Sequence, residues 1–407
     1  MKKLDTIIIG AGAAGLMLAN QLNEHSHEFL LIERNDQVGK KLLLTGNKRC
    51  NVTNNLAVEQ FIQALTFKHK RFLYPALTRF DNHAIIQFFK THGVALKLEE
   101  NFKYFPEADK SEVIINALLK GIDPMRIRLN QTVKDIIDYD GTYLVKTNQE
   151  DYLAKHVVVA TGSMSFPHTG STGDGLDFAK RLNIKTTPFT PAETVVYSDQ
   201  VTRLFKEVQG TVIKDVNLFL PNQKKPMQGD ILFTHFGLSG PLIMHASEFI
   251  YDALSNNLRT VKLCFLPFNP KQLEDKLFML KETNQSLHDL ISPYFTKRFT
   301  KHLITLLADD IVDLQNTSNK RLRKLAHDLL NFPITIDKVQ SASKAYVNKG
   351  GVDTKALNPK TMEVKLYPGL YFIGETVDVH GPIGGFNLTI AFSTAYSACM
   401  SIIKKHR

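Results

Sequence analysis

The chain has 407 residues, of which 43% are hydrophobic and 22% are charged. At about 100–200 residues per domain this length predicts two or three domains, and the composition excludes disorder, collagen and coiled coil as the main architecture. Lys and Arg number 50 against 40 Asp and Glu, and the net charge of +10 fits an acidic partner such as RNA or a phosphorylated ligand, although many globular proteins are basic without one.

The number of cysteines and the first residues of the chain indicate the cellular compartment of the protein. Cys50, Cys264 and Cys399 are odd in number and widely spaced, so we expect neither a disulfide framework nor a metal site, and a reducing cytoplasm fits. The start, Met1-Lys2-Lys3 and an apolar stretch, resembles a signal peptide, but three regularly spaced glycines interrupt it. No apolar run approaches the roughly 18–20 residues that span a bilayer. We therefore expect a cytoplasmic protein without a membrane segment.

The first 33 residues predict a nucleotide-binding βαβ unit. We expect a strand over 4–9, a helix over 16–22, and a second strand over 29–32 that ends at Glu33. Between the first strand and the helix lies Gly10-Ala11-Gly12-Ala13-Ala14-Gly15. A glycine fingerprint with a flanking strand, helix and acid is typical of a Rossmann-type dinucleotide site.

Each glycine of this fingerprint has an expected role. Gly10 permits a tight turn, Gly12 lets a pyrophosphate approach the backbone, and Gly15 lets the helix pack on the sheet. The helix start at Ala13 and Ala14 offers N–H groups and a positive dipole to phosphates. The Glu33 carboxylate, followed by Arg34, is expected to accept hydrogen bonds from a ribose. The fingerprint alone does not distinguish an NAD site from an FAD site. It also does not distinguish a nucleotide site from a tight turn that binds no ligand.

The segment over 39–54 is expected to be a long, basic binding loop beside this site. It reads as a poor strand and a poor helix, and polar loops beside a dinucleotide site usually bind the ligand. A solvated basic loop is the alternative. The expected cofactor contacts within it are Lys41, Thr45, Arg49, Cys50 and Asn51.

The middle of the first half is expected to turn from helices to strands. The segment over 57–119 is predicted to be mostly helical, and short strands then follow over 125–145, where Val133 is an expected cofactor contact. A buried strand over 156–160 runs into Ala160-Thr161-Gly162, a turn that passes close to the dinucleotide in two-part flavin domains. The run over 170–175 starts a helix but does not match Gly-x-Gly-x-x-Gly, so no separate NAD(P) fold is predicted.

A composition shift near Pro188 and Pro191 indicates an insertion. The chain then reads as strands and turns to about residue 253, and as basic helices over 271–330. Its densest basic cluster is either a solvated helix face or a contact for RNA phosphates. That cluster consists of Lys320, Arg321, Arg323 and Lys324.

Flavin-like features return at the end of the chain. A strand over 370–373 runs into Gly374 and Glu375, an arrangement that holds a ribityl chain near the pyrophosphate in FAD proteins. A helix to about residue 403 then begins after Asp378, and its start can direct N–H dipoles at the flavin ring. The expected contacts at that start are Gly384, Gly385, Phe386 and Asn387. Cofactor features at both ends predict one FAD domain interrupted by an insertion.

These blocks together resemble the BaiN-like flavoproteins, also called the aminoacetone-oxidase family of FAD-dependent enzymes, over nearly the whole chain. The most specific blocks are Arg49-Cys50-Asn51-x-Thr53-Asn54 and Phe233-Thr234-His235-Phe236-Gly237-Leu238-Ser239-Gly240-Pro241. The resemblance implies an α/β fold: a Rossmann-type FAD-binding domain interrupted by a β-barrel-like domain and a small helical domain. The expected boundaries are 1–190 and 346–407 for the FAD domain, 191–267 and 332–345 for the β-rich insertion, and 268–331 for the helices.

The chain departs from the family pattern at two places. Asn47 and Lys48 stand where Gly-Gly is usual, and Asn348 and Lys349 stand where Thr and a small residue are usual. Both segments are expected to border the flavin. We expect FAD binding to tolerate these changes, and we expect any effect of them to be on the choice of substrate.

The resemblance implies an FAD-dependent oxidoreductase that transfers a hydride at flavin N5, with NAD(P)H as a candidate donor. Related proteins divide between reduction of a uridine in ribosomal RNA, small-amine oxidation and steroid double-bond reduction, and the basic charge tilts the expectation slightly to RNA. A non-catalytic or redox-sensing FAD protein is a further alternative. Candidate general acids are Cys50, His235 and His380, each of which could equally be structural.

Overall fold

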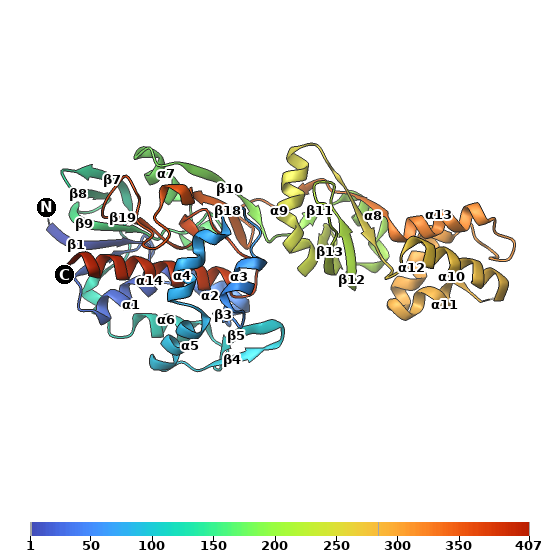
Figure 1. The fold of residues 1–407 in the computed structure, drawn as a ribbon, viewed down its shortest axis with the longest axis horizontal. Coiled ribbons are helices and arrows are strands. Elements are labelled where there is room, and N and C mark those ends of the chain that lie inside the picture. The colour runs from blue at the N-terminus through green and yellow to red at the C-terminus, as the bar shows by residue number, and fades with distance from the viewer. Residues whose placement is uncertain (1, 284, 407) are drawn as a thin grey trace. The chain divides into compact units, whose positions relative to one another are not determined.

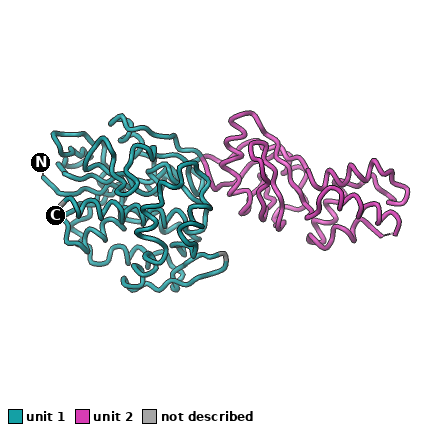
Figure 2. The backbone as a smooth tube through the Cα atoms, viewed as in Figure 1, with its two compact units in different colours: residues 1–190, 342–407 teal, residues 191–341 magenta. Residues whose placement is uncertain are grey.

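The computed structural model describes residues 2–283 and 285–406. The chain divides into two compact units, one formed by residues 1–190 and 342–407 and the other by residues 191–341 (Figure 2). The first unit is therefore built from both ends of the chain. Each unit has its own hydrophobic core and is described separately.

A seven-stranded sheet forms the centre of the first unit, in the order β6-β2-β1-β9-β8-β7 with β19 also paired to β9. The pairs β1–β2, β1–β9, β9–β19 and β2–β6 are parallel, and β7–β8–β9 are antiparallel. Buried apolar residues such as Ile7, Ile8 and Val158 fill the parallel strands, as expected for a sheet covered on both faces. The strands are β1 (Lys2–Ile9), β2 (Phe29–Ile32), β6 (Ile127–Arg128), β7 (Val133–Tyr139), β8 (Thr142–Thr147), β9 (Tyr152–Val159) and β19 (Leu370–Phe372).

Helices α1 (Ala13–Glu24) and α14 (Phe386–His406) pack against each other beside this sheet (Figure 1). By length and composition α14 could cross a membrane, which the sequence analysis did not expect. However, 72% of its apolar window is buried inside the protein, as in a core helix. The other helices of this unit are α2 (Lys40–Leu44), α3 (Val58–Ala64), α4 (Tyr74–Arg79), α5 (Asn82–Thr91), α6 (Ser111–Leu119) and α7 (Asp174–Arg181).

Two local predictions were wrong in part. The region over 57–119 contains β4 (Leu96–Glu99) and β5 (Lys103–Pro106), which form a three-stranded sheet with β3 (Thr53–Asn54). The segment over 39–54 is not all loop, because it includes α2 and β3. The strands form through tertiary pairing: β5 pairs with the adjacent β4 and also with β3, about 50 residues away, so a short local pattern does not reveal them.

The second unit contains an open seven-stranded sheet in the order β16-β15-β12-β13-β14-β11-β17. The insertion is β-rich as predicted, but its sheet is not a closed barrel, because β16 and β17 end the strand order without pairing to each other. Its strands are β11 (Val196–Tyr197), β12 (Val212–Phe219), β13 (Met227–Phe233), β14 (Gly237–Ser239), β15 (Thr260–Cys264), β16 (Phe332–Thr335) and β17 (Lys338–Val339).

Helices complete the second unit. Leucines at helical spacing on α10 to α13 join the buried core that also covers the sheet, among them Leu273, Leu303 and Leu325. The helices are α8 (Asp199–Leu204), α9 (Pro241–Ser255), α10 (Pro270–Thr283), α11 (Leu287–Ile291), α12 (Lys297–Ala308) and α13 (Asn319–Leu330). The two remaining strands, β10 (Thr186–Ala192) and β18 (Val347–Val352), form a two-stranded sheet where the chain leaves for the insertion and returns.

Candidate functional site

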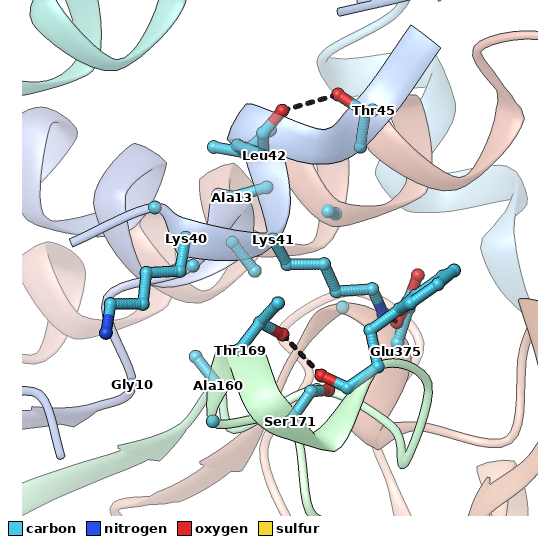
Figure 3. A pocket seen from close by; sticks show the side chains of 18 of the residues that line it. Gly10, Ala13, Lys40, Lys41, Leu42, Thr45, Ala160, Thr169, Ser171 and Glu375 are labelled. Atoms are coloured by element: carbon cyan, nitrogen blue, oxygen red, sulfur yellow. Dashed lines mark hydrogen bonds and ion pairs between the residues drawn. The ribbon is translucent and has the colours of Figure 1, made fainter. Parts of the chain in front are cut away.

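A cavity of about 660 Å³ lies at the carboxyl ends of β1, β2, β9 and β19, and all of its walls belong to the first unit (Figure 3). Its volume is within the roughly 300–1,000 Å³ of small-molecule sites, and the carboxyl edge of a parallel sheet is where such folds bind ligands. The walls come from segments 9–14, 32–35, 39–47, 103–105, 131–133, 160–162, 166–171, 346–347, 373–375 and 383–388, together with Asn51, Asp174, Phe178 and Ala391.

The glycine turn after β1 leaves space for a ligand at one position only. A Cβ on Gly10 (φ +101°) would lie 2.7 Å from the Ala160 carbonyl oxygen, and a Cβ on Gly15 would lie 1.9 Å from the Gly10 carbonyl oxygen. In contrast, a Cβ on Gly12 would meet no atom of the chain within 4 Å. Gly10 and Gly15 are therefore required by packing, while Gly12 opens the first turn of α1 to the cavity, as a pyrophosphate requires.

Glu33 is held firmly at the end of β2. Its Oε2 accepts a hydrogen bond from the Ala11 amide at 2.8 Å, and its Oε1 accepts from the Asn35 amide at 2.9 Å and from Asn35 Nδ2 at 2.7 Å. The side chain lines the cavity and is only 7% exposed. These bonds fix an acceptor beside the glycine turn, which is the position expected for the ribose contact.

A second acidic residue faces the cavity from the other end of the chain. The Glu375 carboxylate accepts from Lys41 Nζ at 2.6 Å and from the Ser163 hydroxyl at 2.9 Å; the reach of Lys41 toward Glu375 is visible in Figure 3. Burial raises the pKa of Glu375, but Lys41 and Ser163 outweigh burial and hold that pKa below its usual range. Gly374, just before it, must be glycine, because a Cβ there would lie 2.9 Å from Ala14 Cβ in α1.

The start of α14 forms the far end of the cavity. Gly384 (φ +131°) and Gly385 (φ +83°) turn the chain into the helix, and a Cβ on Gly385 would lie 2.4 Å from the Thr53 carbonyl carbon. With its amide oriented to suit its neighbours, Asn51 accepts from the Gly385 amide at 3.0 Å and donates to the Thr53 carbonyl at 3.0 Å. Asn54 Nδ2 donates to the Gly384 carbonyl at 3.2 Å. The specific Asn51-x-Thr53-Asn54 block thus fixes the backbone at this helix start.

Most of the predicted cofactor residues meet in this one cavity, although they come from seven separate segments. Those that line it are Gly10, Gly12, Ala13, Ala14, Glu33, Arg34, Lys41, Thr45, Asn51, Val133, Ala160, Thr161, Gly162, Gly374, Glu375, Gly384, Gly385 and Asn387.

Five predicted residues support the cavity without lining it. Arg49 forms ion pairs with Glu99 and with Asp109, and its guanidinium lies 4.3 Å from the ring centroid of Phe105, which does line the cavity. Arg49 therefore holds a wall residue in place through these contacts. The others are Gly15, packed on Gly10; Cys50; Asp378, whose amide donates to the Val352 carbonyl; and Phe386, whose ring lies 4.6 Å from that of Phe61.

The three candidate general acids are not brought together. Cys50 is fully buried in the core with a left-handed backbone (φ +64°), and burial raises its pKa to about 12. His380 is buried, with its ring 5.5 Å from that of Phe67. His235 is exposed in the second unit beside Phe236, where the ring centroids are 5.0 Å apart. None of the three lines the cavity, so we assign no proton transfer to them.

Sequence reasoning missed several wall residues. Phe166, His168 and Tyr346 line the cavity, and the ring of Phe166 lies about 6 Å from each of the other two, at 6.0 and 5.9 Å. The glycine-rich run that follows Phe166 was the available signal, but it was read only as a helix start. Lys103 and Phe105 were missed because the hairpin that carries them was expected to be helical.

The two departures from the family pattern differ in position. Asn47 lines the cavity, while Lys48 beside it does not. Asn348 is buried, accepting from the Met164 amide at 3.1 Å and donating to the Ala342 carbonyl at 2.9 Å, so it ties together two segments that lie outside the cavity wall at these residues. Lys349 is partly buried and lies outside the cavity wall.

Three features define a two-part FAD-binding flavoprotein. They are the glycine turn that leads into α1, the fixed acid after β2, and the second glycine turn that leads into α14. The residues present fit that cofactor, because the open side of Gly12 accommodates phosphates and the cavity continues from there to α14. The chain belongs to the family described as HI0933-like protein Rossmann domain, whose model matches residues 4–401.

Similar proteins agree with this assignment. The chain is 28% identical to the ribosomal RNA dihydrouridine synthase of Haemophilus influenzae, covering 98% of this chain and 99% of that protein, and 28% identical to that of Escherichia coli, covering 99% of both. It is 25% identical to the 3-dehydro-bile acid delta(4,6)-reductase of Clostridium scindens, covering 96% and 97%. A solved 3-ketosteroid-delta4-(5alpha)-dehydrogenase of Rhodococcus jostii shares the fold, with a TM-score of 0.55 at 12% identity over 98% and 97% of the two chains.

The protein is therefore an FAD-dependent oxidoreductase, and the predicted family, fold class and enzyme class are confirmed.

Proposed function

We propose that the protein reduces the C5–C6 double bond of a uridine in ribosomal RNA. The observation that carries the proposal is the full-length similarity to two relatives named for that reaction, which spans the FAD unit and the insertion alike. When bound, FAD supplies the hydride, and a proton completes the reduction. NAD(P)H is the proposed reductant of the FAD.

The chain's own residues would bind and orient the cofactor. Glu33 would hold the ribose, and the first turn of α1 at Gly12 would receive the pyrophosphate. The Glu375 carboxylate, fixed by Lys41, would accept hydroxyl donors between the phosphates and the ring. The glycine turn before α14 would receive the ring itself.

Reduction of an enone in a steroid-like substrate is the second candidate. The bile acid reductase relative also aligns over nearly the whole chain, at slightly lower identity. The two reactions share their chemistry, since each adds a hydride and a proton to a carbon–carbon double bond conjugated with a carbonyl. The net charge of +10 favours the polyanionic substrate over the steroid.

The ion pairs of the second unit guide our choice of the basic surface proposed for RNA, because they engage two residues of the predicted cluster. In the predicted cluster on α13, Arg321 Nε donates to Asp310 at 2.7 Å, and Arg323 pairs with Glu274 at 3.6 Å. On α12, by contrast, Lys297, Arg298 and Lys301 are exposed and have no ion pair within residues 2–283 and 285–406. We therefore propose that α12 supplies the principal phosphate contacts.

Binding to a ribosomal RNA fragment across a salt series tests this proposal. The variant reverses the three α12 charges (K297E/R298E/K301E), and the control reverses three exposed lysines of the FAD unit (K120E/K134E/K146E), so both lose the same net charge. At about 0.7 per phosphate contact on single strands, the α12 variant should flatten the log–log salt slope by about 2. Equal slopes in both variants would contradict the α12 surface, and a wild type without RNA affinity at low salt would favour the enone reductase.

A further inference from the structure

The two ends of the cavity are chemically distinct, and this fixes the direction of a bound FAD. Glu33 and the Gly12 turn define the end for ribose and phosphates. Asn51, Phe105 and the start of α14 also line the cavity, and we assign the flavin ring to that end. We propose that Lys103, at that end, is the cation that contacts the flavin ring and stabilises its reduced, negatively charged form.

The position of Lys103 is set by two strand pairings. It is the first residue of β5, where it pairs in register with Asn54 of β3 on one side and Glu99 of β4 on the other. Its side chain lies along the glycine turn before α14, because its Cε would be 3.6 Å from a Cβ placed on Gly384. The residue is partly buried and lines the cavity.

The charges around the cavity single out this lysine. Of the four Lys and Arg side chains that line it, Arg34 pairs with Asp174 at 3.1 Å, Lys40 with Asp36 at 2.6 Å and Lys41 with Glu375 at 2.6 Å. Lys103 alone of the four has no ion pair or hydrogen bond from its side chain to any residue in the described chain, 2–283 and 285–406.

The nearby acids are already neutralised. Glu99 and Asp109 form a network with Arg49 and Lys97, in which Lys97 Nζ lies 2.6 Å from Asp109 Oδ2. This network holds the hairpin against the cavity while leaving the Lys103 ammonium without an anion. An anionic ligand group at this end of the cavity would supply the missing counter-charge.

Reduction of FAD creates such an anion. Two electrons and one proton convert the neutral oxidised ring to a reduced ring with one negative charge. A cation beside the ring stabilises the product more than the reactant, and the positive end of the α14 dipole acts in the same direction. Lys103 should therefore raise the midpoint potential of the bound FAD. This inference rests on the FAD chemistry alone and holds for either candidate substrate.

The test is the two-electron midpoint potential of the FAD-loaded protein, measured against a reference dye during anaerobic reduction. Lys103→Met keeps the aliphatic stem and removes the charge, Lys103→Arg keeps the charge, and Lys110→Met removes one exposed charge outside the cavity. We expect Lys103→Met to lower the equilibrium constant for two-electron reduction of the bound FAD about tenfold. This corresponds to a midpoint potential about 30 mV lower. Lys103→Arg and Lys110→Met should stay close to the wild type.

Three results would overturn the inference. The first is an unchanged potential in Lys103→Met with full FAD content. The second is a loss of FAD affinity in Lys103→Met without a shift in potential, which would place the lysine at the phosphates. An equal shift in Lys110→Met would also reject it, because the effect would then be one of net charge only.

Discussion

At the scale of single residues, the site depends on side chains whose partners fix them before any ligand binds. Glu33 accepts three hydrogen bonds from Ala11 and Asn35, and Glu375 is held by Lys41 and Ser163. Both carboxylates come from strand ends on the same edge of the sheet. Such preorganised acceptors bind a ligand without a cost for ordering the side chain.

Glu33→Ala is predicted to lower FAD affinity roughly ten- to hundredfold. The physical reason is the loss of charge-assisted hydrogen bonds to a ribose, which contribute about 1.5–3 kcal/mol. The measurement is a fluorescence titration of the apoprotein with FAD. Glu28→Ala, at an exposed glutamate that lies at the opposite, amino end of β2, is the matched control. An unchanged affinity in Glu33→Ala would show that this acid is not at the ribose.

Spacing in the sequence was sufficient to find residues that act through local geometry, such as Gly10, Glu33 and Asn387, and they line the cavity. Spacing in the sequence could not identify residues whose role depends on partners far away in the chain. Arg49 is occupied by Glu99 and Asp109, about 50 and 60 positions away, which no local pattern reveals.

At the scale of elements, the turn from β1 into α1 separates two functions of glycine. Gly12→Ala is predicted to leave the free energy of unfolding within about 0.5 kcal/mol of the wild type, since its Cβ meets no atom of the chain and its φ of −83° suits alanine. FAD affinity should nevertheless fall at least about tenfold, because the added methyl occupies the expected pyrophosphate position.

Gly15→Ala is predicted to do the reverse. Its Cβ would overlap the Gly10 carbonyl, so the strand and helix must separate, at about 1–3 kcal/mol or more. Urea unfolding of the two apoprotein variants measures their stability. FAD titration of each variant that folds then measures its affinity, and the two measurements together distinguish the two effects. A Gly12→Ala protein that binds FAD normally, or a Gly15→Ala protein of wild-type stability, would contradict this division of roles.

The elements with uniformly apolar or helically spaced patterns were the ones that sequence could predict. β1, α1, β2 and α14 all fall within a few residues of their expected positions. The β4–β5 hairpin could not be found in the same way. Its strands have four residues each, and Phe102 at its turn has a left-handed φ of +62°, a conformation rare for a bulky residue. Lys103 was missed for that reason.

At the scale of the whole molecule, one chain carries two cores with separate tasks. The FAD unit is formed by residues from both ends of the chain, and the residues that line the cavity belong to this unit. The composition shift near Pro191 predicted an insertion, but the openness of its sheet depends on which strands pair, and composition does not encode that. Its exposed basic helix α12 is the surface that we propose for RNA phosphates.

The most direct measurement is the conversion of uridine to dihydrouridine in ribosomal RNA. FAD-loaded protein is reduced anaerobically and mixed with ribosomal RNA from cells that lack the protein, and the nucleosides are then analysed by mass spectrometry. The proposal predicts a uridine that gains two hydrogens in proportion to the flavin reoxidised. A flavin that stays reduced with RNA, gives no dihydrouridine and is reoxidised by a steroid enone would contradict it.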